Sequence, residues 1–261
     1  MPGPAIVLAI ETSNPSAWEL SVPVRPGVAV VEMARPGTHA TPAIATAPSR
    51  VLAVEEIDPS RPHDDDLVPA IDRVVRAAGL TPAGLNRIAV SSGPGGFTAV
   101  RMAVTAAKTI ADVVGIDLVL VPSATSAAAA SVGLGRTPRA VHEPFLVAIA
   151  SKDQTAWAAE FDEHGTPASE PRLIAAADLG GCSCRVLMAD RYLPDSMREA
   201  ARSGGWRVMV PVFDAVACAA ASAPLRATDP LAAVPLYPRA PEAVRKWEEV
   251  QARKALGEPP G

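Results

Sequence analysis

Residues 91–101 read SSGPGGFTAVR and join a predicted strand to a predicted helix. The apolar run before them, RIAVS at 87–91, is typical of a buried strand. The glycine turn GPGG at 93–96 follows, and residues 97–114 then carry a helical pattern of apolar side chains. A strand that leads through a turn into a helix is the repeating unit of layered α/β folds, so this stretch decides the fold class.

Two turns in the sequence have the residue types of a phosphate-binding loop. In the first, Gly93, Gly95 and Gly96 precede a helix N-terminus, which favours anions. In the second, Thr12 and Ser13 follow an earlier apolar run and offer hydroxyl and N–H groups. Glycines also simply permit a tight turn and close packing, and Ser and Thr are common where strands end. Spacing alone favours this packing interpretation.

The helix predicted over 97–114 is apolar around most of its circumference. Its polar residues fall on one narrow stripe: Thr98, Arg101, Thr105, Lys108 or Thr109, and Asp112. Five alanines would let a neighbouring backbone approach closely: Ala99, Ala103, Ala106, Ala107 and Ala111. A helix of this kind is covered on more than one side. We expect one side to face the parent sheet and another to meet a partner; the alternative is a central helix of a monomeric core.

A second amphipathic helix is predicted over 64–78. Its apolar residues recur at helical spacing: Leu67, Ile71, Val74, Val75 and Ala78. Three aspartates at 64–66 complement the exposed N–H dipoles of a helix start, and Gly79 and Pro82 supply the stop. Pro69 is compatible because it falls in the first turn.

The remaining pattern predicts two α/β lobes of similar plan. Strands are expected at 5–10 and 51–57, with a hairpin of 18–24 and 28–34 between them and a surface loop at 35–50. Beyond residue 118 the expected elements are a strand at 118–121, a helix at 123–131, a hairpin of 145–150 and 155–161, and then alternating strands and helices at 185–189, 194–202, 208–210 and 213–223. We therefore divide the chain into an N-terminal lobe (1–118), a C-terminal lobe (119–230) and a final segment (231–261) whose last residues we expect to be disordered.

Composition excludes several classes of protein. A hydrophobic content of 49% over 261 residues suffices for a large core. The net charge of −4 argues against a surface that binds nucleic acid unaided. No run approaches the roughly 18 apolar residues of a membrane span, so we expect a cytoplasmic protein without membrane contact. Cys182, Cys184 and Cys218 form no even-numbered disulfide framework, and we expect free thiols.

Four segments together resemble the TsaB (YeaZ) family. They are LAIETS at 8–13, RPHDDDLVPAIDRVVRAAGL at 61–80, IAVSSGPGGFTAVRMAVTAAKTIA at 88–111 and FLVAIASKDQTAWAAEF at 145–161. PLYPRAP at 235–241 resembles the closing segment of that family. The resemblance implies a two-lobed, actin-like and sugar-kinase-like α/β fold. It also implies a non-catalytic subunit that works with a TsaD-like catalytic subunit and a TsaE-like ATPase in forming threonylcarbamoyladenosine on tRNA.

The resemblance further implies that the helices at 64–78 and 97–114 dock on the partner, or on a second copy in a homodimer. The expected interface residues are Leu67, Ile71, Val74, Ala99, Met102, Ala103, Ala106 and Ile110. Contact with tRNA would then be indirect, through the partner.

Departures from the pattern of the catalytic relative predict that this chain has no catalytic residues, no metal and no cofactor. That relative holds its metal with two histidines four residues apart on a helix, whereas here Leu67 stands four residues after His63. Glu11 replaces the usual Asp of the first phosphate loop, so we regard Thr12, Ser13 and the glycine turn as vestigial. Two alternatives remain open: an enzyme of the same fold, acting as a small-molecule phosphotransferase or threonylcarbamoyl transferase, and a peptidase, for which no Ser or Cys has a recognisable base.

Overall fold

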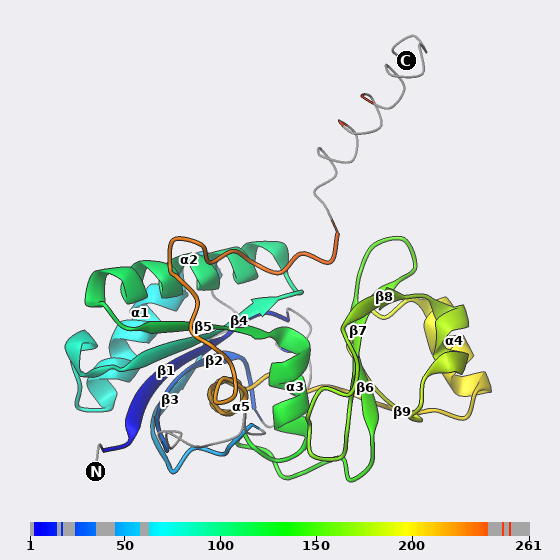
Figure 1. Ribbon diagram of the computed structural model, residues 1–261, viewed down its shortest axis with the longest axis horizontal. Coiled ribbons are helices and arrows are strands. Elements are labelled where there is room, and N and C mark those ends of the chain that lie inside the picture. Colours follow the sequence, from blue (N-terminus) through cyan, green and yellow to red (C-terminus); the bar gives the residue numbers. More distant parts are fainter. Residues whose placement is uncertain are drawn as a thin grey trace.

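The computed structural model describes residues 3–14, 17, 24–34, 45–57, 63–239, 247 and 251. Two mixed β-sheets lie side by side, each with helices on its faces (Figure 1). This is the two-lobed α/β fold of the actin-like and sugar-kinase-like kind that the sequence predicted. None of the described helices is long and apolar enough to cross a membrane.

The first lobe is built on a sheet with the strand order β3-β2-β1-β4-β5. Its strands are β1 (Ala5–Glu11), β2 (Gly27–Met33), β3 (Arg50–Glu56), β4 (Arg87–Gly93) and β5 (Asp117–Pro122). The pairs β1–β2 and β2–β3 are antiparallel, while β4 runs parallel to both β1 and β5. Because β1 and β4 are parallel neighbours, the Thr12–Ser13 turn and the glycine turn emerge at the same edge of the sheet.

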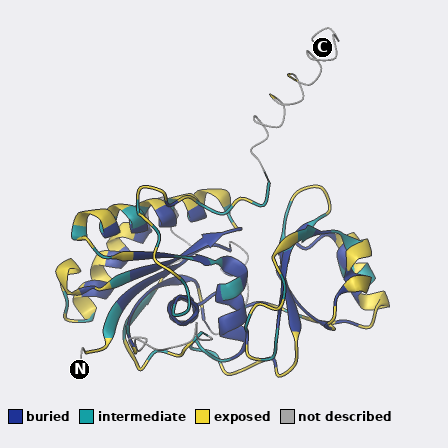
Figure 2. Cartoon of the chain, in the orientation of Figure 1, coloured by how far each residue is buried: buried dark blue, intermediate teal, exposed yellow. Residues whose placement is uncertain are grey.

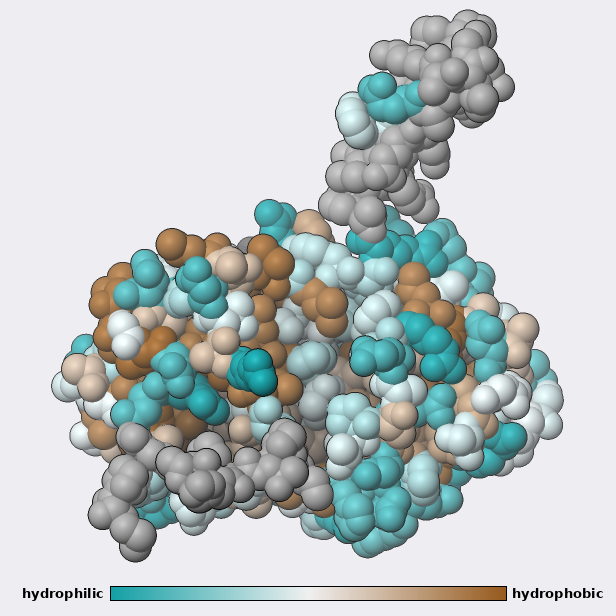
Figure 3. Space-filling model, viewed as in Figure 1, coloured by the Kyte–Doolittle hydropathy of each residue, from teal (hydrophilic) through white to brown (hydrophobic). Residues whose placement is uncertain are grey.

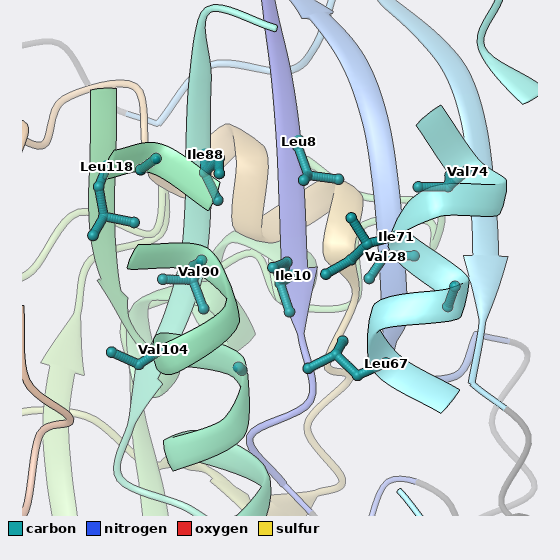
Figure 4. Packing of buried hydrophobic residues seen from close by; sticks show 14 of the residues in the cluster. Leu8, Ile10, Val28, Leu67, Ile71, Val74, Ile88, Val90, Val104 and Leu118 are labelled. Carbon is teal, nitrogen blue, oxygen red and sulfur yellow. The ribbon is translucent and has the colours of Figure 1, made fainter. Parts of the chain in front are cut away.

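Helices cover both faces of this sheet. α1 (His63–Ala77) and α2 (Phe97–Val114) lie on one face, and α3 (Ser123–Ser131) and α5 (Ala215–Ala221) lie on the other. Alternate residues of β1 therefore serve two cores, with Leu8 beneath α1 and α2 and Val7 beneath α5. This double burial explains why β1 is an unbroken apolar run. Figure 4 shows the α1–α2 side of the core.

The second lobe is a smaller sheet with the order β10-β9-β6-β7-β8. Its strands are β6 (Phe145–Ala150), β7 (Ala156–Phe161), β8 (Arg172–Ile174), β9 (Val186–Ala189) and β10 (Arg207–Met209). α4 (Asp195–Ser203) covers its outer face, and α3 packs on the inner face as well as on the first sheet. The predicted hairpin of β6 and β7 is confirmed.

The chain returns to the first lobe after building the second. α5 packs on β1 and β2, and residues 228–239, which we call the C-terminal strap, run over α2 (Figure 1). Thr228 N–H donates to the Leu118 carbonyl oxygen at 2.7 Å, at the edge of β5. The predicted boundary between 118 and 119 falls inside β5. Because α5 also packs on the first sheet, the first lobe combines two separate stretches of chain.

The helices agree closely with the sequence predictions. α1, α2 and α3 lie within one residue of their predicted bounds. β2 pairs antiparallel with β1 on one side and with β3 on the other. Residues 18–23 of the predicted hairpin of 18–24 and 28–34, 35–44 of the predicted loop and nearly all of 240–261 lie outside the described residues.

Candidate functional site

The two predicted phosphate turns meet and pack on each other. Gly96 N–H donates to the Ser13 carbonyl oxygen at 2.7 Å. A Cβ atom at position 95 would stand only 2.0 Å from that same oxygen, so a close approach of backbones requires Gly95. Gly93 has φ = +104°, which also favours glycine. Gly93 and Gly95 therefore meet backbone and packing requirements of the two turns.

Glu11 turns the first loop inward. Its side chain is fully buried, and Oε1 accepts hydrogen bonds from Ser13 N–H at 2.9 Å and Ser13 Oγ at 2.8 Å. Burial raises the pKa of the Glu11 carboxyl, and nearby hydroxyls, led by that of Ser126, oppose this only in part. Both donors of Ser13 are thus engaged by the protein itself. Glu11 Oε2 and Thr12 Oγ1 are buried with no hydrogen-bond partner among the described residues.

A buried contact joins the lobes beside this junction. Asn14 Nδ2 donates to Asp190 Oδ2 at 3.1 Å, across 176 residues of sequence. Tyr192 N–H donates to Asp190 Oδ1 at 2.9 Å. Burial raises the pKa of the Asp190 carboxyl, although the Asn14 amide favours its charged form. Sequence reasoning missed this pair because neither residue stands in a motif.

The described residues contain no group of three or more His, Cys, Asp or Glu side chains placed to hold a metal. The side chain of His63 lies outside the described residues, and Leu67 is buried in the core. All three cysteines are buried free thiols. Burial raises the pKa of Cys184 to about 11 and that of Cys218 well above its usual value, which keeps both protonated and unreactive at neutral pH.

An apolar groove of about 480 Å³ lies at the surface between α1 and α2. Its lining residues are Leu67, Val68, Arg101, Met102, Thr105, Ala106, Thr109 and Ile110. Val68 is 62% exposed, although it is a large apolar side chain. Figure 3 shows hydrophobic side chains gathered on the surface where α1 and α2 lie. A second hollow of about 450 Å³ shares Val68 and Ile110 with the groove, so the apolar surface continues around α1.

Four of the predicted interface residues are buried within the lobe itself. Leu67, Ile71, Val74 and Ala103 are 3%, 6%, 1% and 0% exposed and belong to the core of the first lobe. Figure 4 shows Leu67, Ile71 and Val74 directed at the sheet, so α1 uses this stripe to pack on its own strands. Of these four, Leu67 alone also reaches the groove.

The other four predicted interface residues lie at the boundary between core and surface. Ala99, Met102, Ala106 and Ile110 are partly buried, and the last three line the groove. Figure 2 shows this division along α2, with buried residues towards the sheet and exposed ones outward. Sequence reasoning missed Val68, whose signal was an apolar residue outside the helical stripe of α1.

The architecture and this site define the class: a two-lobed actin-like, sugar-kinase-like α/β protein. A family model for TsaD, the tRNA N6-adenosine threonylcarbamoyltransferase, matches residues 57–211, which is more than half of the chain. The chain therefore belongs to this family and is a TsaB (YeaZ)-like, tRNA-modification-related protein. A comparison with curated protein sequences gives no match.

Solved structures with the same fold agree with this assignment. One is an uncharacterized protein with similarity to the peptidase YeaZ from Pseudomonas aeruginosa, with a TM-score of 0.62 and 16% identity over 90% of this chain and 100% of that chain. Another is YeaZ from Pseudomonas aeruginosa, with a TM-score of 0.60 and 15% identity over 89% and 99% of the two chains. At this identity the likeness establishes the fold alone.

Proposed function

We propose that the chain is a non-catalytic partner subunit of a tRNA threonylcarbamoyladenosine-forming complex. It docks on a TsaD-like catalytic subunit through α1 and α2, works with a TsaE-like ATPase in the cytoplasm, and reaches tRNA only through its partner. A homodimer through the same helices is the second form that this surface permits. The observation that carries the proposal is the apolar groove between α1 and α2.

The groove has the composition of the centre of a protein interface. Apolar side chains line it, and the small residue Ala106 lets a partner helix approach closely. A monomeric soluble protein rarely leaves such a surface uncovered without a binding role. The partner that fits is a helix or helix pair with large apolar side chains.

The charges beside the groove specify the partner further. On α1, Arg76 pairs with Asp72 at 2.9 Å, and Arg73 pairs with Asp66 at 2.9 Å. Arg101 instead rests over the ring of Phe97, 4.8 Å from its centroid, with no acidic partner among the described residues. An interface that covers the groove would therefore place a carboxylate of the partner opposite Arg101.

The junction of the two turns supports a role without chemistry of its own. Ser13 and Gly96 have their N–H groups occupied within the protein, and the backbones are too close to admit a phosphate between them. The alternative function, an enzyme of the same fold, has one observation in its favour: the buried Thr12 hydroxyl beside the turn, which finds no hydrogen-bond partner within the part of the chain that the structure describes. Calorimetry of the isolated chain with ATP and with ADP decides between them, since the alternative requires tight nucleotide binding.

The docking role is tested by co-expression with the TsaD-like subunit and measurement of tRNA modification. Ala106→Glu places a charge in the groove, and we expect affinity to fall about 100-fold because a buried charge would be left unpaired. Val113→Glu is the matched control, since Val113 lies on the same helix, is 79% exposed and does not line the groove. The docking proposal fails if Ala106→Glu associates and supports modification as well as Val113→Glu does.

A further inference from the structure

The C-terminal strap contacts the first lobe at the glycine turn. Leu236 N–H donates to the Ser92 carbonyl oxygen at 2.7 Å, and Lys108 Nζ donates to the Ala233 carbonyl oxygen at 3.3 Å. Tyr237 then packs against Phe97, with ring centroids 5.7 Å apart. These contacts seat residues 233–237 on β4 and α2.

Two residues further on, the strap is held by the second lobe. The guanidinium of Arg239 pairs with the carboxylate of Asp153 and donates to the Lys152 carbonyl oxygen at 3.2 Å and to Thr155 Oγ1 at 3.0 Å. All three acceptors belong to the turn between β6 and β7. In this turn Asp153 and Gln154 both adopt left-handed φ values, +58° and +57°.

A hollow of about 260 Å³ lies between these anchor points. The first lobe contributes the glycine turn and the start of α2, the second lobe contributes residues 150–152, and the strap contributes residues 236–238. The strap therefore forms a wall of the space between the lobes and crosses from one to the other.

We propose that residues 236–239 form an interlobe latch, with Arg239 as its catch on the β6–β7 turn. The latch holds the lobes closed over the glycine turn, and release of Arg239 frees them to separate. Asn14–Asp190 is another polar contact between the lobes, and both of its residues are buried. Arg239 and Asp153 are 27% and 65% exposed, so water can replace their contacts and the catch can open without unfolding either lobe. This inference does not depend on the proposed docking function.

The test measures the distance between the lobes directly. Spin labels on Thr98→Cys in α2 and Glu199→Cys in α4 report one exposed site on each lobe, and the three buried native thiols stay unlabelled. We expect a single narrow distance distribution in the otherwise unchanged chain. Arg239→Ala should add a population at longer distance, and hydrogen exchange at the Ser151 amide, which bonds to Thr155 O, should become about tenfold faster.

Two further variants make the result decisive. Asp153→Asn removes the other half of the ion pair and should produce the same longer population, which also decides the matter if Arg239→Ala folds poorly. Arg226→Ala is the matched control, an exposed arginine just before the strap, and should leave the distribution unchanged. Unchanged distributions in Arg239→Ala or, if that variant does not fold, in Asp153→Asn would overturn the latch. A distance distribution that broadens as much in Arg226→Ala as in Arg239→Ala would also overturn the latch.

Discussion

The junction of the two turns and the groove between α1 and α2 lie in the same lobe and differ in how much of their surface is exposed. At the junction, Ser13 and Gly96 use their polar groups on the protein itself, and Glu11 is fully buried. In the groove, Val68 and its neighbours leave apolar surface exposed to solvent. The junction contains the conspicuous sequence motif, yet the exposed apolar surface lies in the groove. A recognisable motif and an available binding surface are therefore separate properties of this lobe.

The sharpest test of where the groove ends compares two alanines of α2, three residues apart. Ala103→Glu would bury a carboxylate in the core, and we expect it to destabilise the protein by about 4 kcal/mol or more, enough to prevent folding. Ala106→Glu should cost less than about 1 kcal/mol, because its side chain reaches solvent. Urea denaturation measures both. Equal losses would mean that the two residues share one environment and that the groove is part of the core.

A substitution at the junction of the two turns should lower the stability of the protein without weakening its association with a partner. Gly95→Ala forces the Ser13 carbonyl to move, and we expect it to lower the free energy of unfolding by about 2 kcal/mol. Gly180→Ala is the matched control, because a Cβ atom there meets nothing within 4 Å. Association with the catalytic subunit should be unchanged in both. A binding defect in Gly95→Ala, under conditions where it is folded, would mean that the junction itself is part of the interface.

Buried Glu11 makes stability depend on pH. Its pKa is raised in the folded state by burial, so the folded protein holds a proton that the unfolded chain has released. Stability is therefore full below the unfolded pKa and is lost as the pH rises through the folded pKa. Glu11→Gln keeps an acceptor for Ser13 without a charge, and thermal unfolding should show it more stable than the parent at pH 8, with the difference shrinking towards pH 4. An exposed control, Glu199→Gln, should show no such trend.

The smallest expected effect lies at the edge of the groove. Arg101→Ala should weaken association about fivefold, or ~1 kcal/mol, because an ion pair at the rim of an interface is partly screened by water. The loss should shrink at high salt. Arg76→Ala removes a guanidinium that Asp72 already occupies and should change affinity less. If the two variants are indistinguishable at low salt, the partner places no carboxylate opposite Arg101.

The local sequence pattern predicted the helices of this fold well, but it did not predict which of their sides are buried. α1 and α2 have strong apolar periods and clear stops at Gly79 and Gly115, so their bounds could be read from the sequence. The side of α2 that faces solvent could not be predicted from the sequence. Alanine occurs on both sides of this helix, and its small side chain does not distinguish a buried side from an exposed one. Ala103 and Ala106 look alike in sequence and differ only in what the fold brings next to them.

Long-range pairing was the second limit. Helix α5 packs on β1 and β2, about 200 residues earlier in the chain. The contact of Asn14 with Asp190 spans a similar separation. No period or spacing encodes such contacts, so the interlobe features could be found only from the structure.

The return of the chain to its first lobe has a consequence for synthesis on the ribosome. Ala233 is buried in the same core cluster as residues of α1 and α2, and α5 completes the core on the opposite face of the sheet. The strands and helices that emerge first therefore complete their cores only after residues 215–233 have been made.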